Sequence, residues 1–391
     1  MRPTDPTIAP TVPASEPAAE IASPGIVRHV LMTGDAVGGV WTYAVDLARA
    51  LGERGVRVSL AMMGPPASDT QRHDIAAIAT AEMYERPYAL EWMDDPWCEV
   101  DDAGDWLLDL ERELAPDVVH LNGYCHAALH WRAPVLAVGH SCVLSWWRAV
   151  YGTDAPAKWD RYAEKVADGL QAADLVVTPT AAMMSSLDFH YGPLLRRRVI
   201  PNGRYASGLY ATPPSSKDAL VLTAGRLWDQ AKNVESVAAV APYLSWPVSI
   251  AGESRRPDGD CVSYGGVHCL GRLGAHELAA WMGRAAIFAS PARYEPFGLS
   301  ILEAALAGCA LVLGDIRSLR EIWGDTALFV PPDNRRALAS AIETLVHDDV
   351  YRQELAERSQ ARGRTLAPRR MANSYYEAYR ELARERLPLT A

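Results

Sequence analysis

Short apolar runs alternate with segments of helical periodicity along most of this chain. Apolar runs of about four to eight residues bounded by turn residues are typical of buried strands, and strands that alternate with helices are typical of parallel sheets. In the first half, strands are predicted over residues 26–33, 56–62, 117–121, 134–139 and 174–178, with helices over 40–51 and 105–114. In the second half, strands are predicted over residues 220–224, 248–251, 267–270, 285–289, 310–313 and 327–330. The pattern predicts an α/β protein whose two halves share one architecture.

A stretch of turn-forming residues separates the two halves. Gly208 and the run Thr212–Ser216 break regular structure. Residues 205–217 are therefore predicted to link a domain over residues 26–204 to a second domain over residues 218–370.

The two ends of the chain differ in composition. Residues 1–25 are rich in Pro, Ala, Thr and Ser and lack the apolar core of a signal peptide, so a disordered tail is predicted there. The last residues, 371–391, hold one charged amphipathic helix over Ala372–Arg386.

Length and charge exclude several classes of protein. A chain of 391 residues is long enough for two domains that each bury a core. Its 48 acidic and 38 basic residues give a net charge of −10, which argues against a nucleic-acid-binding protein. No apolar run approaches the roughly 18 residues of a membrane-spanning helix, whereas peripheral contact with a membrane stays open. Six cysteines without paired spacing favour a reducing compartment and a cytoplasmic location.

Two glutamates flank the start of a predicted helix in the second half. The strand 285–289 leads to a turn that holds Glu295, and an apolar helical segment follows from Leu299. The free N–H groups of Phe297, Gly298 and Leu299 would favour an anion such as a phosphate.

Glu303 is the only charged residue between Glu295 and Asp315. A carboxylate accepts two hydrogen bonds at once, which suits the vicinal hydroxyls of a sugar or a ribose. Phosphate and sugar groups together predict a sugar nucleotide. The alternative is that Glu303 pairs with a structural arginine and that Glu295 is an ordinary loop acid.

Two cations bracket a loop upstream of these glutamates. Arg226 and Lys232 follow the predicted strand 220–224, and ligands bind at the carboxyl ends of strands in open α/β sheets. Two cations in one loop can neutralise a diphosphate. The alternative is a pair of solvated side chains at a helix start.

The first half carries a glycine-bearing turn and a strand-end histidine. Gly38 and Gly39 lack the Gly-x-Gly-x-x-Gly spacing of a dinucleotide fingerprint, so the turn is either a plain tight turn or a place where a ligand approaches the backbone. His140 follows the strand 134–139, and no nucleophile elbow accompanies its neighbour Ser141.

These features resemble the retaining glycosyltransferases of family 4, also called glycosyl transferases group 1, in which a Glu-x7-Glu motif matches Glu295 and Glu303. Further segments match motifs of this family in the same order along the chain: Gly38–Val40, Val138–Ser141, Val199–Gly203 and Gly225–Lys232. The resemblance implies the GT-B fold, in which two Rossmann-like domains with parallel sheets face each other across a cleft. It also implies that the terminal helix returns to the first domain.

The resemblance assigns roles to these positions. Arg226, Lys232 and the helix start at Phe297, Gly298 and Leu299 are expected to hold the diphosphate. Glu303 is expected to bind the ribose and Glu295 the donor sugar. His140 is expected beside the reacting sugar carbon, Gly38 and Gly39 beside the diphosphate, and Leu273 in the nucleotide-sugar site. His120, His126 and His130 lack this motif context and are interpreted as structural or acceptor-side residues.

Aromatic residues offer weaker candidates for the acceptor. Trp146 and Trp147 could stack on a sugar ring, although most tryptophans belong to cores. The acidic segment Glu91–Asp105 could line an acceptor cleft or form a solvated face.

The resulting hypothesis is a metal-independent, retaining hexosyltransferase. It would move a hexose from a UDP-, GDP- or ADP-sugar to a hydroxyl of a saccharide or small-molecule acceptor. No cofactor is expected, because the two cations would stabilise the leaving diphosphate, and Cys261, His268 and Cys269 lack the spacing of a zinc site. The alternatives are a nucleotide-sugar epimerase or hydrolase on the same fold, or a non-catalytic partner that binds sugar nucleotides.

Overall fold

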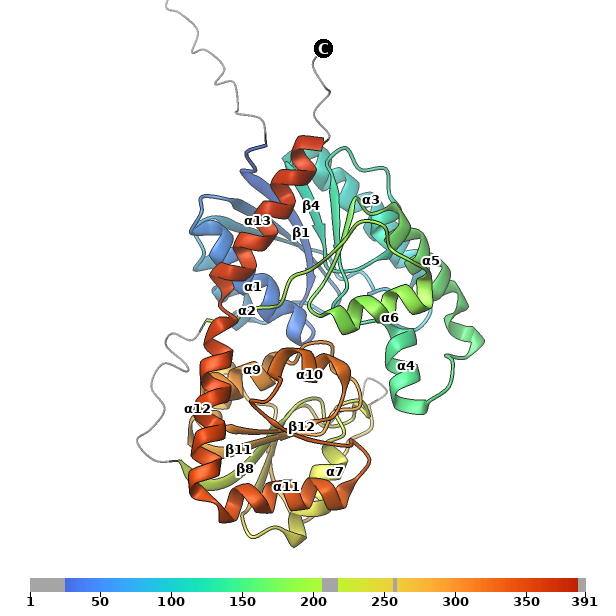
Figure 1. Cartoon of the computed structure of the whole chain (residues 1–391). Coiled ribbons are helices and arrows are strands. Elements are labelled where there is room, and N and C mark those ends of the chain that lie inside the picture. Colours follow the sequence, from blue (N-terminus) through green and yellow to red (C-terminus); the bar gives the residue numbers. More distant parts are fainter. Residues whose placement is uncertain (1–24, 206–216, 256–258, 386–391) are drawn as a thin grey trace, which may run out of the picture.

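The computed structural model describes residues 25–205, 217–255 and 259–385 and contains two parallel sheets stacked end to end in one elongated molecule (Figure 1). Most of the predicted tail 1–25 and most of the predicted linker 205–217 lie outside the described residues. The α/β fold with two Rossmann-like halves is confirmed.

The first sheet has seven parallel strands in the order β3-β2-β1-β4-β5-β6-β7. Its strands are β1 His29–Asp35, β2 Arg57–Met63, β3 Ala81–Glu85, β4 Val118–Leu121, β5 Val135–Val138, β6 Leu175–Thr178 and β7 Arg197–Val199. Its helices are α1 Gly39–Gly52, α2 Asp69–Ala76, α3 Trp97–Leu114, α4 Val143–Tyr151, α5 Asp160–Ala172 and α6 Ala181–Tyr191, with short 3-10 turns at Cys125–Ala128 and Ala157–Trp159. All seven residues of β1 are buried, as expected for a strand with helices on both faces.

The second sheet has six parallel strands in the order β10-β9-β8-β11-β12-β13. Its strands are β8 Asp218–Ala224, β9 Val248–Ala251, β10 His268–Gly271, β11 Ala285–Ser290, β12 Ala310–Gly314 and β13 Leu328–Val330. The helices of this half are α7 Val234–Val240, α8 Ala275–Arg284, α9 Leu299–Leu306, α10 Arg317–Trp323, α11 Arg335–His347 and α12 Asp349–Thr365, with a 3-10 turn at Ala241–Tyr243. Apolar side chains of the strands point alternately to the two faces of this sheet. Helices α8, α9 and α10 cover one face, and α7, α11 and the first turns of α12 cover the other.

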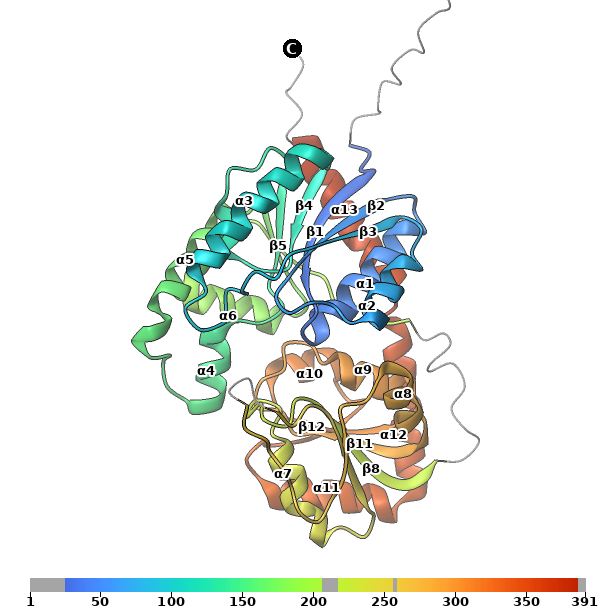
Figure 2. The same cartoon turned by 180° about the vertical axis from the view of Figure 1, so that it is seen from behind.

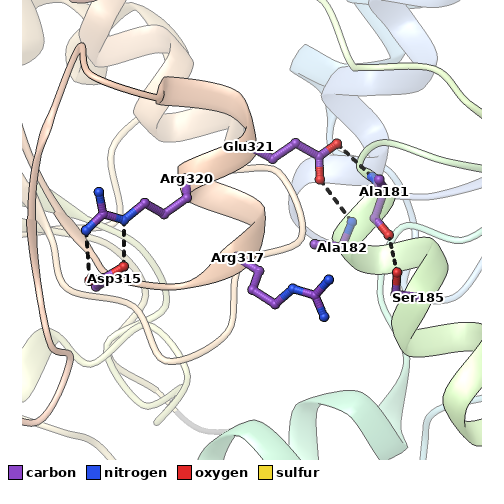
Figure 3. A pocket seen from close by; sticks show the side chains of 7 residues that line it. All are labelled: Ala181, Ala182, Ser185, Asp315, Arg317, Arg320 and Glu321. Atoms are coloured by element: carbon purple, nitrogen blue, oxygen red, sulfur yellow. Dashed lines mark hydrogen bonds and ion pairs between the residues drawn. The ribbon is translucent and has the colours of Figure 1, made fainter.

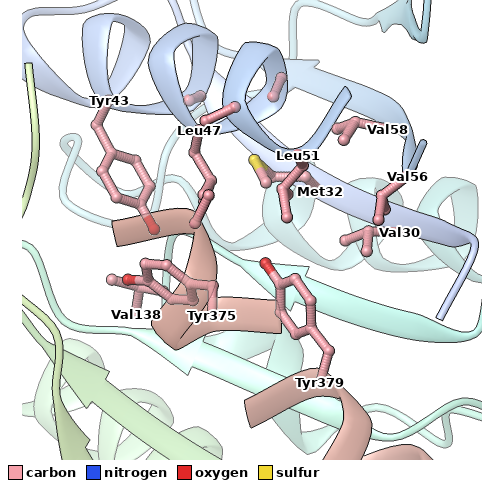
Figure 4. Packing of buried hydrophobic residues seen from close by; sticks show 14 of the residues in the cluster. Val30, Met32, Tyr43, Leu47, Leu51, Val56, Val58, Val138, Tyr375 and Tyr379 are labelled. Carbon is pink, nitrogen blue, oxygen red and sulfur yellow. The ribbon is translucent and has the colours of Figure 1, made fainter. Parts of the chain in front are cut away.

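The last helix, α13 (Pro368–Glu385), belongs to the core of the first half. α12 runs along the second half, the chain turns after Thr365, and α13 lies against α1 (Figure 1). Tyr375 and Tyr379 are fully buried beside Tyr43 and Leu47 of α1 (Figure 4). The terminal helix therefore packs on the first half, and it begins four residues before the predicted start at Ala372.

Three observed elements differ from the prediction. Strands β3 and β7 were not predicted, because Ala-Glu-Met-Tyr-Glu and Arg-Arg-Val lie partly exposed at the two edges of the sheet and have no apolar run. Helix α3 begins at Trp97 rather than Asp105, and it covers the face of the first sheet that is turned toward the viewer in Figure 2. Asp101, Asp102 and Asp105 lie on its exposed side, so much of the acidic segment is a solvated helix face.

Candidate active site

The start of helix α9 lies where the two halves meet, since Leu299 comes close to Gly39 of the first half. Gly298 precedes the helix with φ 89, in the left-handed region that favours glycine. A Cβ at Gly298 would approach Ile301 Cδ1 to 2.7 Å and Glu295 Cγ to 3.3 Å. The glycine therefore lets the turn that holds Glu295 fold closely against the first turn of α9, at the carboxyl edge of β11.

The two predicted cations converge on the same edge of the sheet. Lys232 Nζ donates to Glu295 Oε2 at 2.5 Å, across 63 positions of sequence. Arg226 Nη2 donates to Asp229 Oδ2 at 2.7 Å. The structure thus brings Arg226, Lys232 and Glu295 into one charged cluster beside α9.

The glycine turn of the first half faces this cluster across the cleft. A Cβ at Gly38 would lie 3.5 Å from Arg226 Nη1, and one at Gly39 would lie 3.3 Å from Leu299 Cδ1. Gly38 has φ 73, so a larger residue there would be strained as well as crowded. Both halves therefore contribute backbone to the same space.

Glu303 has a different immediate partner from the predicted ribose. It is buried on α9, and its Oε1 accepts a hydrogen bond from Arg204 Nε at 2.8 Å. Arg204 Nη1 also donates to Asp46 Oδ2 of α1 at 2.8 Å. This ion pair matches the alternative of a structural arginine, and a contact of Glu303 with a ribose stays a prediction.

His140 lies half-buried at the end of β5. Its Nε2 is 2.8 Å from Asn122 Oδ1, and the ring of Tyr43 packs edge-on with a centroid distance of 4.5 Å. Burial lowers the pKa of His140 to about 3, so the imidazole is neutral at pH 7. A neutral ring can orient a hydroxyl but does not supply a positive charge.

The aromatic candidates occupy α4, which projects toward the second half (Figure 1). Trp146 Nε1 donates to Asp229 Oδ1 at 3.1 Å, so this indole is bound to the loop of Arg226. Trp147 packs on Tyr151 with ring centroids 4.6 Å apart. Leu273 is half-buried two residues beyond the end of β10, at the carboxyl edge that carries the other second-half candidates.

Four polar residues of the cleft were missed in the sequence: Asp35, Asn122, Arg204 and Asp229. Asp35 ends β1, and Asn122 follows β4 directly, so the strand-end rule that selected His140 would have found both. Asp229 lies between Arg226 and Lys232 and carries hydrogen bonds from both halves. No local signal in the sequence marks Arg204, because Asp46 and Glu303, to which it donates, lie on distant helices.

The pKa values of Asp229 and Asp35 are shifted in opposite directions. Burial of Asp229 by itself would raise its pKa, but Arg226 and Lys232 outweigh this effect and lower the pKa. Burial raises the pKa of Asp35 to about 6, against smaller opposing effects of the Val37 N–H and Arg226. Asp229 is therefore a stable counter-ion, whereas Asp35 changes its charge near neutral pH.

A cavity of about 480 Å³ lies apart from these residues. It lies between α6 and α10 and is lined by Ala181, Ala182, Ser185, Asp315, Arg317, Arg320 and Glu321 (Figure 3). There Glu321 accepts the backbone N–H groups of Ala181 and Ala182 at 2.7 and 2.9 Å. The contact of Glu321 with Ala181 and Ala182 joins the second half to the first at this cavity. A smaller hollow of about 50 Å³ in the first half includes Asp35, Glu91, Trp92 and Asn122.

Further contacts hold the two halves together next to the charged cluster. The backbone N–H of Cys142 donates to Tyr294 Oη at 3.1 Å, and Thr180 Oγ1 donates to the Pro296 carbonyl at 3.0 Å. The turn that holds Glu295 is therefore fastened on both sides to the first half, close to the loop that follows His140.

The comparison with known families decides the class of the protein. Residues 37–204 match the model described as Glycosyltransferase Family 4, and residues 218–348 match the model described as Glycosyl transferases group 1. The chain belongs to the family 4 glycosyltransferases. Glycogen synthase of Mycobacterium tuberculosis is 29% identical to this family 4 glycosyltransferase over 280 residues, which cover 65% of this chain and 66% of the relative.

Solved structures agree on the fold of this family 4 glycosyltransferase. Sucrose-phosphate synthase of Thermosynechococcus elongatus superimposes with a TM-score of 0.72 at 18% identity and covers 91% of this chain and 99% of its own. HepE of Anabaena, solved in complex with UDP-glucose, superimposes with a TM-score of 0.71 at 16% identity and covers 90% of this chain and 98% of its own. Within the described residues, no helix is both long and apolar enough to cross a membrane.

Proposed function

We propose that this glycosyltransferase is a retaining hexosyltransferase. Its donor would be a nucleotide diphosphate sugar, and its acceptor a hydroxyl of a saccharide or small molecule. The observation that carries the proposal is the charged cluster of Arg226, Lys232 and Glu295 beside the first turn of α9. The UDP-glucose complex of the structural neighbour HepE makes UDP-glucose the first donor to test.

The proposed chemistry is electrostatic. The bond between the anomeric carbon and the diphosphate oxygen breaks, and negative charge grows on the leaving diphosphate. Arg226 and Lys232 stabilise that charge, together with the backbone N–H groups at the start of α9. The acceptor hydroxyl attacks from the face that the diphosphate leaves, and its proton passes to a phosphate oxygen. Retention of the anomeric configuration follows from this geometry.

Different residues would hold the rest of the donor. Glu303 binds the ribose, Glu295 binds hydroxyls of the donor sugar, and His140 orients the sugar near its anomeric carbon. Lys232 donates to Glu295, so one cation would contact both the diphosphate and the residue that binds the donor sugar. Leu273 contributes to the nucleotide side. Trp147 is the better acceptor candidate of the two tryptophans, since the indole N–H of Trp146 is bound to Asp229.

No metal is required in this proposal, because two cations already balance the diphosphate. Activity should therefore survive EDTA. A complete loss of activity in EDTA that Mg²⁺ or Mn²⁺ restores would contradict this part of the proposal and leave the transferase assignment intact.

The experiment that tests the function is a donor screen by thermal shift, followed by product analysis. UDP-, GDP- and ADP-glucose are compared, since a ligand that binds the native state must raise the melting temperature. Donor that binds but is only slowly hydrolysed without acceptor supports a transferase. Rapid turnover of donor alone would favour the epimerase or hydrolase alternative, and binding without turnover under any acceptor would favour a non-catalytic partner.

A further inference from the structure

Asn122 has a side-chain orientation that its hydrogen bonds determine. Its Nδ2 lies 2.7 Å from the carbonyl oxygen of Thr33, and its backbone N–H donates to Thr33 Oγ1 at 2.8 Å. A carbonyl oxygen can only accept a hydrogen bond, so the amide nitrogen must face Thr33. The amide oxygen, Oδ1, therefore faces the opposite way.

Two imidazole rings meet that amide oxygen. His140 Nε2 lies 2.8 Å from Asn122 Oδ1, and His120 Nε2 lies 3.2 Å from the same atom. An amide oxygen carries no hydrogen, so His140 Nε2, for which Asn122 Oδ1 is the partner, must carry one.

His120 has a tyrosine hydroxyl beside each ring nitrogen: Tyr43 Oη lies 3.3 Å from Nε2, and Tyr379 Oη of α13 lies 2.6 Å from Nδ1. Because a hydroxyl can donate or accept, both neutral tautomers of His120 satisfy these contacts. His140, with its proton on Nε2, has an unprotonated Nδ1, and this atom has no hydrogen-bond partner among residues 25–205, 217–255 and 259–385.

We propose that Asn122 is a positioning residue that holds His140 as the neutral Nε2–H tautomer, so that His140 Nδ1 accepts a hydrogen bond from a substrate hydroxyl. The placement of that hydroxyl on the bound sugar rests on the proposed function. The tautomer itself does not, because it follows from contacts within the protein. The site would therefore require a hydroxyl that donates at this position, and replacement of that hydroxyl by fluorine would remove the contact.

The groups around His140 are consistent with a neutral ring. Tyr43 of α1 packs against it edge-on, His120 of β4 shares Asn122 with it, and burial lowers the pKa of both histidines to about 3. The ring is therefore neutral over the range from pH 6 to pH 9, and its tautomer does not depend on pH there.

The direct test is a two-bond ¹H–¹⁵N spectrum of the intact protein labelled at histidine. Comparison with a His140→Gln variant assigns the His140 signals. We expect Nε2 protonated and Nδ1 unprotonated, and the opposite tautomer would overturn the proposal. Because this measurement needs no substrate, it separates failure of this inference from failure of the proposed function.

A functional test uses Asn122→Asp. A carboxylate beside His140 stabilises the imidazolium and raises its pKa, and the imidazolium has a proton on both nitrogens and no acceptor. Activity of the variant should therefore fall tenfold or more as the pH drops from about 9 to 6, whereas wild-type activity changes little. A loss of the same size at every pH would mean that Asn122 has only a structural role and would overturn the proposal.

Tyr379→Phe is the matched control. It removes the hydrogen bond to His120 and leaves Asn122 and its contacts to Thr33 and His140 in place. We expect a lower melting temperature with an unchanged His140 tautomer and an unchanged pH profile. A changed tautomer in this control would show that α13, rather than Asn122, orients His140, and would overturn the assignment.

Discussion

Each cation of the cleft has a carboxylate partner. Arg226 pairs with Asp229, and Lys232 pairs with Glu295, so the two cations are held in place by acids of the same sheet edge. Asp229 and Glu295 are both largely buried, so removing either cation leaves a buried carboxylate without its partner, which lowers stability. A charge aimed at a leaving group also contributes strongly to rate. The roles of these residues should therefore appear in kinetics as well as in folding.

We expect Arg226→Ala and Lys232→Ala each to lower transferase activity on the order of 10²-fold or more, because each removes a charge that stabilises the leaving diphosphate. Melting temperatures should fall as well, because each variant leaves a largely buried carboxylate, Asp229 or Glu295, without its cation. Arg284→Ala is the control, since Arg284 is a half-exposed arginine of the same half that pairs with Asp218. Retained activity in both cleft variants would contradict the proposed site.

The two glutamates should separate nucleotide binding from turnover. Glu303→Gln should weaken the binding of free UDP, because its predicted contact is the ribose. Glu295→Gln should leave UDP affinity nearly intact and lower turnover, because its predicted contact is the donor sugar. Calorimetric titration of both variants decides the assignment, and the reverse pattern would exchange the two roles.

Asp35 links charge to stability at the end of β1. Its pKa of about 6 in the folded state exceeds the value of about 3.9 in an unfolded chain. The protonated acid therefore favours the folded state below about pH 4, and this contribution is lost as the pH rises through about 6. A shift of this size corresponds to about 3 kcal/mol at most.

Asp35→Asn should thus raise the melting temperature relative to wild type at pH 8 but not at pH 4.5. Asparagine keeps the oxygen that accepts the Val37 N–H. Differential scanning calorimetry at both pH values tests this, and an equal difference at both would show that ionisation of Asp35 is not the cause.

At the scale of elements, α4 connects the first half to the loop that holds Arg226. The hydrogen bond from Trp146 to Asp229 joins α4 to the loop of Arg226, and Asp229 in turn holds Arg226. A hydrogen bond to a charged group contributes about 1.5–3 kcal/mol, less where the pair is partly solvated.

Trp146→Phe keeps the aromatic packing of α4 and removes this donor. We expect kcat/KM to fall roughly tenfold through misplacement of Arg226, and the melting temperature to fall modestly because one hydrogen bond to a buried carboxylate is lost. Tyr151→Leu is the control, because it removes a ring that packs edge-on against Trp146 and leaves the indole N–H in place. Equal effects of the two substitutions would mean that aromatic packing, rather than the hydrogen bond, is responsible.

At the scale of the whole molecule, residues of both halves form the candidate site. Glu321 of α10 accepts two N–H groups at the start of α6, and Tyr294 reaches the apolar cluster of Cys142 and Met183. A carboxylate is favoured at a helix N-terminus, so the Glu321 contact stabilises the closed arrangement.

We expect Glu321→Ala to open the molecule and to increase its radius of gyration in small-angle scattering. Saturating donor should reverse the change, because donor contacts are predicted on both halves. Glu357→Ala, on the exposed side of α12, is the control. An unchanged radius in Glu321→Ala would show that the remaining contacts suffice for closure.

Local pattern predicted most of the fold of this glycosyltransferase. The eleven predicted strands are observed because buried parallel strands are continuous apolar runs, whose signal lies within a few residues. Strand β3 has no such run, and its partner β2 decides its structure. Likewise, the position of Arg226, Lys232 and Glu295 at strand ends follows from the order of elements.

What only the tertiary structure decided is the partner of each polar group in the cleft. Arg204 and Glu303 are 99 residues apart, Trp146 and Asp229 are 83 apart, and His120 and Tyr379 are 259 apart. Sequence periodicity reports which face of an element is buried, but it carries no information on which distant residue lies opposite. The amino-acid sequence therefore determined the two sheets, the family and the sheet edge on which the candidate site residues lie. The packing of the halves and of α13 determined how Glu303, Asp229 and His140 are held.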